Sequence, residues 1–160
     1  MKTVYVKTLS GEVIPVELSS YDTLQFSVER ALDIKPGYRA RLFDSDREEI
    51  FDAEEVFNGE LLSVLVEPYD FTVSCMEVDR VEEPTSGTVF TKYMLEIDEG
   101  VRVYYYESTI GYLIERDVAF ESFGELEFEP EHLLASLDQV LDRLFPEWDE
   151  EVREAILTKL

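Results

Sequence analysis

The chain has one cysteine and one histidine, its only candidates for a thiol–imidazole pair that could perform nucleophilic catalysis. Cys75 falls within an alternating pattern that predicts a strand, where a cysteine is usually buried and unreactive. His132 falls in the first turn of a predicted amphipathic helix, on its polar side. A nucleophile needs a base and an orienting group nearby, and no motif brings such groups together. We therefore expect no catalytic residue and a protein that is not an enzyme.

Residues 44–55 (DSDREEIFDAEE) place acidic side chains at positions 1, 3, 5, 9 and 12, the outline of a calcium-binding EF-hand loop. Glu49 stands where that loop requires glycine, and the flanking patterns are those of strands rather than helices. We therefore expect a solvated acidic loop without a metal. A single histidine and a single cysteine leave little for a transition-metal site, and the glycines are scattered as turn residues. No cofactor is expected.

The chain is strongly acidic, with 37 Asp and Glu residues against 14 Lys and Arg and a net charge of −23. Nucleic acid and anionic membranes are therefore disfavoured as ligands, because both need a cationic surface. Protein partners, including basic ones, are favoured. The lone cysteine cannot form an internal disulfide, so we expect an intracellular protein, cytoplasmic or nuclear. No apolar stretch approaches the ~20 residues of a membrane-spanning helix.

The first third of the chain predicts a sheet with one helix packed on it. Alternating apolar residues predict strands over 2–8 and 12–18, joined by a tight turn at Gly11. Asp22 is expected to cap a helix, with Gln25 as its capping-box partner and Pro36 near its end. Three further strands are predicted over residues 39–43, 50–51 and 61–66. A sheet with a helix on one face is an α+β arrangement.

Four segments of this region carry a more specific signal: residues 6–12 (VKTLSGE), 22–24 (DTL), 41–43 (RLF) and 61–66 (LLSVLV). In order and spacing they resemble the V-K-T-L-T-G-K hairpin, the D-T-I helix start, the R-L-I-F strand and the final T-L-H-L-V-L strand of ubiquitin. The resemblance covers about residues 1–68 and implies a ubiquitin-like β-grasp domain.

The same resemblance implies a protein-binding surface, and it also bears on whether the domain could be conjugated to other proteins. Ubiquitin is mostly recognised through an apolar patch, whose positions fall here on Leu9, Phe43 and Leu65. Strand alternation agrees in part, because Leu65 faces outward if Leu62, Val64 and Val66 face the helix. The patch is either a partner site or an interface covered by the second part of the chain. The terminal glycines through which ubiquitin is conjugated have no counterpart, so attachment as a modifier is not expected.

From residue 69 the pattern changes to longer alternating runs. They predict strands over 71–81, 88–97 and 101–106, with a further strand over 112–123. A leucine-rich stripe predicts a helix over 131–145, and Asp149 is expected to cap a last helix. Residues 69–160 should therefore form an antiparallel α+β domain with a C-terminal helical hairpin. This part carries 23 acidic and 7 basic residues, a net charge of −16.

Two features of this second part suggest protein contacts. Consecutive tyrosines place aromatic rings on both faces of one strand, a pattern typical of a buried strand or an interface, and we expect Tyr104 and Tyr106 to contact a partner. Residues 141–157, with Leu144, Phe145 and Pro146, resemble the start of a CUE domain, a small ubiquitin-binding module, although its third helix has no counterpart. The alternative is a helical hairpin whose Phe-Pro corner packs on the sheet.

Together these observations favour a non-enzymatic, adaptor-type protein that uses a ubiquitin-like domain as a binding surface. Two alternatives stay open: a structural subunit of a larger assembly, and an acidic mimic that binds a basic protein.

Overall fold

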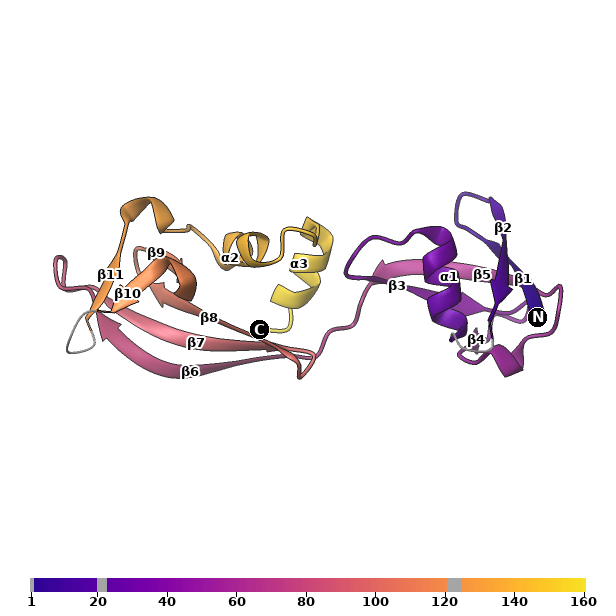
Figure 1. The fold of residues 1–160 in the computed structure, drawn as a ribbon, viewed down its shortest axis with the longest axis horizontal. Coiled ribbons are helices and arrows are strands. Elements are labelled where there is room, and N and C mark those ends of the chain that lie inside the picture. Colours follow the sequence, from indigo (N-terminus) through magenta and orange to yellow (C-terminus); the bar gives the residue numbers. More distant parts are fainter. Residues whose placement is uncertain (1, 20–22, 121–124) are drawn as a thin grey trace. The chain divides into compact units, whose positions relative to one another are not determined.

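The structure, a computed structural model, describes residues 2–19, 23–120 and 125–160 (Figure 1). The chain is a mixed α+β protein and divides into two compact units, Met1–Tyr69 and Asp70–Leu160. They are called the N-terminal unit and the C-terminal unit below.

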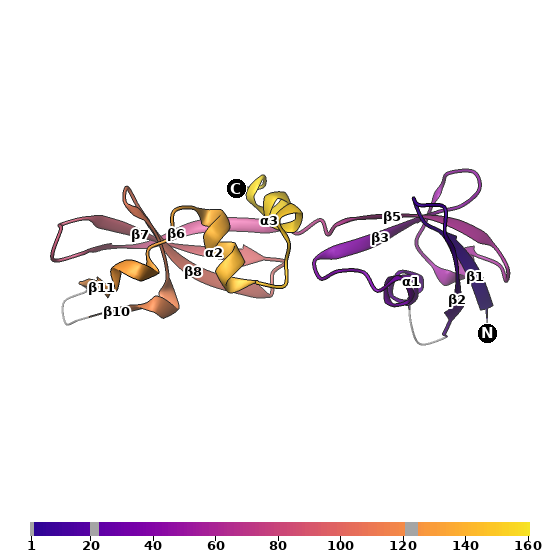
Figure 2. The same cartoon turned by 90° about the horizontal axis from the view of Figure 1, so that it is seen from above.

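The N-terminal unit is a five-stranded sheet with one helix on one face (Figures 1 and 2). Its strand order is β2-β1-β5-β3-β4; β1 and β5 run parallel, and the other pairs are antiparallel. The elements are β1 (Lys2–Lys7), β2 (Val13–Leu18), α1 (Leu24–Leu32), β3 (Tyr38–Phe43), β4 (Glu49–Ile50), the 3-10 turn η1 (Ala53–Glu55) and β5 (Leu61–Pro68).

The core of the N-terminal unit lies between the sheet and α1. Alternate strand residues point inward, because successive side chains in a strand face opposite sides. The buried set combines these strand residues with one face of α1; it comprises Val4, Val6, Val16, Leu18, Leu24, Val28, Ala40, Leu42, Val56, Leu62 and Val64. The remaining alternate residues are left on the opposite face of the sheet.

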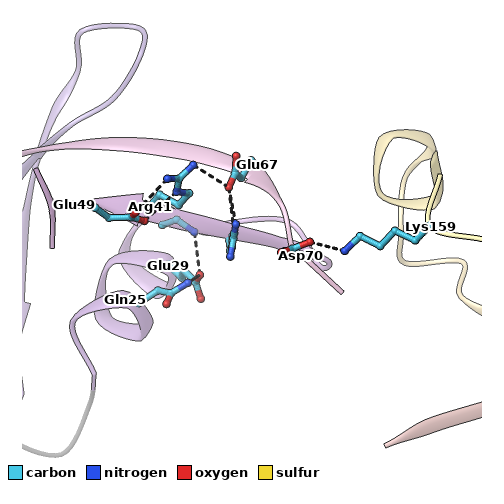
Figure 3. Close-up of polar contacts among 9 residues, drawn as sticks. Gln25, Glu29, Arg41, Glu49, Glu67, Asp70 and Lys159 are labelled. Atoms are coloured by element: carbon cyan, nitrogen blue, oxygen red, sulfur yellow. Dashed lines mark hydrogen bonds and ion pairs between the residues drawn. The ribbon is translucent and has the colours of Figure 1, made fainter. Parts of the chain in front are cut away.

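Helix α1 begins one residue later than the sequence predicts. Thr23 is the N-cap, and its Oγ1 accepts a hydrogen bond from the Phe26 amide at 3.1 Å. The predicted cap, Asp22, lies outside the described residues. The capping-box pairing of Gln25 with Asp22 therefore also lies outside the described residues; the Gln25 side chain donates to Glu29 Oε1 at 3.0 Å. Glu29 also accepts the Ala40 amide at 3.0 Å and so ties the helix to β3 (Figure 3).

The C-terminal unit is built on a long antiparallel sheet in the order β6-β7-β8-β9, accompanied by a two-stranded sheet, β10-β11. Its strands are β6 (Val73–Glu82), β7 (Val89–Ile97), β8 (Val101–Ser108), β9 (Gly111–Ile114), β10 (Val118–Phe120) and β11 (Leu126–Phe128). The 3-10 turns η2 (Glu115–Asp117) and η3 (Pro130–His132) flank the small sheet, and α2 (Leu137–Leu144) and α3 (Glu150–Leu157) follow.

Different elements cover the long sheet at different places. Near the β6–β7 turn, Val81, Phe90, Tyr106 and Leu113 form a buried cluster with Leu126 of the small sheet. Helices α2 and α3 lie over part of the sheet, with α2 against β9 (Figures 1 and 2). Their inward residues are fully buried: Val140, Leu141, Val152 and Ile156. The two C-terminal helices expected from the sequence are therefore present.

The corner between these helices is held by one cation and two rings. The Arg153 guanidinium contacts Asp138 at 2.9 Å and Asp142 at 3.3 Å, and donates to the Trp148 carbonyl at 3.0 Å. The Phe145 and Trp148 rings stack with their centroids 4.3 Å apart. This packing is that of a helical hairpin; the CUE-domain resemblance stays a prediction. Lys159 contacts the Asp70 carboxylate and the Phe71 carbonyl, which ties the last residues of the unit to its first (Figure 3).

The prediction of one helix over 131–145 is wrong in its first half. Leu134 instead forms a two-way backbone bridge with Tyr112, both hydrogen bonds measuring 2.8 Å, and α2 starts only after the N-cap Ser136. The leucines before Ser136 therefore extend along β9 rather than continuing the helical stripe. The predicted strand over 112–123 is also interrupted, because η2 separates β9 from β10; residues 121–123 lie outside the described residues.

Candidate protein-binding surface

One face of the N-terminal sheet points away from α1, and it is called the open face below. Because Val4, Leu42, Leu62 and Val64 point toward the helix, their strand neighbours point the other way. On its three central strands and β4, the open face includes Tyr5, Lys7, Arg39, Arg41, Phe43, Glu49, Leu61, Ser63, Leu65 and Glu67. Tyr5 and Leu61, which are paired in β1 and β5, are both exposed.

Two of the predicted patch residues lie on this face in neighbouring strands. Phe43 of β3 is opposite Ser63 of β5, and Arg41 is opposite Leu65, so Phe43 and Leu65 are diagonal neighbours. Such neighbours are about 7–8 Å apart, within reach of an aromatic and a long apolar side chain. Both side chains are half-buried. Together they form a small apolar area on the open face.

Leu9, the third predicted patch residue, lies in the turn between β1 and β2 and is 84% exposed. The turn directly follows Lys7 of β1. Strand β5 lies between β1 and β3, so Ser63 pairs with Lys7 on one side and with Phe43 on the other. The turn closes through a hydrogen bond from the Thr8 amide to the Glu12 carbonyl, and from the Gly11 amide to Thr8. Gly11 has φ of +89°, a conformation that glycine adopts at little cost.

An ionic network that the sequence did not predict borders this apolar area (Figure 3). Arg41 binds Glu49 through two hydrogen bonds of 2.9 and 3.1 Å, and its Nη1 lies 3.6 Å from Glu67. Arg39 contacts the same Glu67 oxygen at 2.9 Å. The Arg41 guanidinium also lies 5.4 Å from the centre of the Phe43 ring, within cation–π range.

The network fixes the charges beside Phe43. The hydrogen bonds that Arg41 donates to Glu49 lower the pKa of Glu49 below its ordinary value and raise the pKa of Arg41. Both groups are therefore ionised over the physiological pH range. A bidentate pair also restrains the long arginine side chain more than a single contact would. The signal that could have revealed it is the alternation of Arg39, Arg41 and Phe43 along β3.

Of the two contact residues predicted on the tyrosine-rich strand β8, one is buried inside the unit. Tyr106 is fully buried in the cluster with Phe90 and Leu113, so its ring is not available to a partner, contrary to expectation. Register explains this, because Tyr106 faces the small sheet. Tyr104 is half-buried, and the Lys92 ammonium lies 4.9 Å from the centre of its ring.

Cys75 is exposed, so the expectation of a buried thiol is wrong. Strand β6 is an edge of the long sheet, which explains the exposure of most of its residues. Cys75 Sγ lies 3.4 Å from the hydroxyl of Tyr105, and burial raises the pKa of that hydroxyl. His132 Nδ1 lies instead 3.3 Å from the Asp117 carbonyl. Cys75 and His132 therefore have different neighbours and do not form a thiol–imidazole pair.

The carboxylates of residues 44–55 serve local structure. Asp44 accepts the amides of Asp46 and Glu48 at 2.9 and 3.0 Å, and Glu55 accepts the Phe51 amide at 3.1 Å. Among the described residues, no group of three or more His, Cys, Asp or Glu side chains could hold a metal ion. Across the same part of the chain, no helix is long and apolar enough to cross a membrane.

No protein-family model matches the chain, and no curated protein matches it in sequence.

Proposed function

We propose that the chain is a non-enzymatic, adaptor-type protein whose N-terminal unit is a ubiquitin-like β-grasp domain that binds a protein partner through its open face. Three features support the β-grasp assignment: the strand order β2-β1-β5-β3-β4, the central parallel pair and the single helix on one face. The order of the four ubiquitin-like sequence segments agrees with it.

The observation that carries the proposal is the apolar area of Phe43 and Leu65 beside the exposed Leu9. Their positions on β3, β5 and the β1–β2 turn come from three separate segments of the chain. A partly exposed apolar area beside fixed charges is a common form of protein-binding surface. Residues of this kind at the centre of an interface often carry most of the binding free energy.

The test compares proteins captured by the immobilised full chain with those captured by its variants. We expect Leu9→Asp and Leu65→Asp each to weaken capture at least about tenfold, because a carboxylate must then be desolvated against an apolar partner. Phe57→Asp is the matched control, since Phe57 is 69% exposed but lies outside the open face. Circular dichroism checks that every variant folds. Capture that survives both leucine substitutions would contradict the proposal.

A further inference from the structure

The apolar surface of the open face continues beyond the predicted patch onto β1 and β2. Tyr5 of β1 lies opposite Pro15 of β2 on one side and opposite Leu61 of β5 on the other. All three residues are exposed. Val13, also exposed, precedes Pro15 by two residues and so lies on the same face of β2. These four residues cross three strands and are called the second apolar area below.

Lys7 lies between the second apolar area and the predicted patch. It follows Tyr5 by two residues on β1, and Leu9 follows it by two residues in the turn. Val13 is opposite Lys7 on β2, and Ser63 is opposite it on β5. Among the residues that the structure describes, none forms an ion pair or a hydrogen bond with the Lys7 ammonium. The exposed Lys7 is therefore a cation among uncharged neighbours.

The two arginines of the open face, by contrast, are neutralised within it. Arg39 contacts Glu67 at 2.9 Å, and Arg41 binds Glu49 through two hydrogen bonds. Their charges are already balanced before a partner arrives. Lys7 is the cation of this face that has no carboxylate beside it.

The acidic side chain that β2 contributes to the open face is too far away to neutralise Lys7. Glu17 lies opposite Thr3, four residues from Lys7 along β1, a separation of about 13 Å in a strand. Exposed charges at that separation are largely screened, because the screening length is about 8 Å at physiological salt. The open face therefore has a local positive charge at Lys7, although the chain has a net charge of −23.

We propose that the partner segment that binds the open face has an acidic residue with apolar residues on both sides. This partner chemistry rests on the proposed function of the open face. The carboxylate pairs with Lys7, and the apolar side chains pack on the second apolar area and on the patch around Leu9. Charge complementarity favours this occupant, because a basic residue at the same place would meet the Lys7 ammonium with no carboxylate to balance it.

The probe is a library of random peptides displayed on phage and selected on the immobilised full chain. We expect the enriched peptides to contain Asp or Glu with an apolar residue on each side. Enrichment of lysine- or arginine-rich peptides would overturn the proposal, and so would a selection that enriches no peptide.

Fluorescence anisotropy then measures how tightly one enriched, fluorescein-labelled peptide binds the full chain and its variants. We expect Lys7→Glu to weaken binding about tenfold, because the ion pair is lost and a like charge replaces it. A peptide with lysine in place of its acidic residue should bind Lys7→Glu more tightly than wild type. The matched control is Lys35→Glu, which makes the same charge change at an exposed position between α1 and β3 and should alter the affinity less than about twofold.

Two outcomes distinguish the acidic contact from the open face itself. If Leu65→Asp removes peptide binding but Lys7→Glu and Lys35→Glu weaken it equally, the open face is the site and the contact with Lys7 is wrong. If binding survives both Leu65→Asp and Leu9→Asp, the peptides bind elsewhere and the proposed function fails as well. Circular dichroism checks that every variant folds.

Discussion

At the scale of single residues, side-chain neighbours decide which sequence features have consequences. Cys75 stands out in the sequence but lies exposed on an edge strand, whereas Arg41, which the sequence shows only as part of a strand pattern, joins Glu49 and Phe43 on the open face. Gly111 is a second such case. It has φ of +143°, and the backbone of Leu134 runs directly against it.

Gly111→Ala should therefore be strongly destabilising. A Cβ at this position would lie 2.6 Å from the Leu134 carbonyl oxygen, and the backbone conformation disfavours an L side chain. We expect a loss of about 3 kcal/mol in the free energy of unfolding of the C-terminal unit. Urea denaturation followed by the fluorescence of Trp148, the single tryptophan, measures it.

The matched control is Gly87→Ala in the same unit. Gly87 also has positive φ, +71°, but a Cβ there would meet only the Glu82 carboxylate at an ordinary 3.6 Å. Gly87→Ala should lower the free energy of unfolding by only about 1 kcal/mol, the cost of placing alanine at a positive φ. Equal losses in the free energy of unfolding for the two variants would contradict the close approach of Leu134 to β9.

At the scale of elements, periodicity predicts where a helix or strand is possible, and tertiary pairing decides how much of it forms. The leucines of residues 131–145 fit one helical stripe, but Leu134 pairs with Tyr112 of β9 and the helix begins only after Ser136. Strand β6 shows a second tertiary effect. As an edge it carries charged side chains and a register shift between Glu77 and Asp79, both of which discourage pairing with another strand.

The β6–β7 turn depends on the charge of Glu83, whose two oxygens accept hydrogen bonds from the Ser86 hydroxyl and amide and from the Thr85 amide, and its stability should depend on pH. Because folding lowers the pKa of Glu83 to about 2 from an ordinary value of 4.5, its stabilising contribution is present above about pH 4.5 and is lost as the pH falls toward 2. We expect Glu83→Gln to lower the unfolding temperature at pH 7, and the difference from wild type to shrink between pH 5 and pH 2.

Thermal unfolding followed by circular dichroism, for both chains at each pH, measures this difference. A difference that stays constant over that range would mean that the Glu83 hydrogen bonds do not depend on its charge.

At the scale of the whole molecule, net charge is the dominant property. A net charge of −23 on 160 residues produces self-repulsion that the ion pairs around Arg39, Arg41 and Arg153 offset only locally. Excess negative charge also disfavours nucleic acid as a ligand and leaves protein partners as the favoured ones.

Salt should therefore stabilise the chain. Raising sodium chloride from about 0.01 M to about 1 M shortens the screening length from roughly 30 Å to roughly 3 Å, so repulsion between distant carboxylates falls. We expect the unfolding temperature at pH 7 to rise by several degrees. The rise should shrink as the pH approaches the isoelectric point near 4.2, where the net charge vanishes. A fall in unfolding temperature with salt would mean that the surface ion pairs outweigh the repulsion.

The sequence by itself determined the α+β character of the chain and the order of most elements. These follow from local periodicity, which requires only that neighbouring residues alternate between core and solvent. It also placed Leu65 on an outward position of its strand.

Only the tertiary structure decided which strands pair and that Tyr106 is buried while Cys75 is exposed. Parallel pairing of β1 with β5 joins residues far apart in the sequence, and no local pattern records the register. The physical reason is the same in each case: burial and electrostatic environment depend on neighbours that the chain brings together only when it folds.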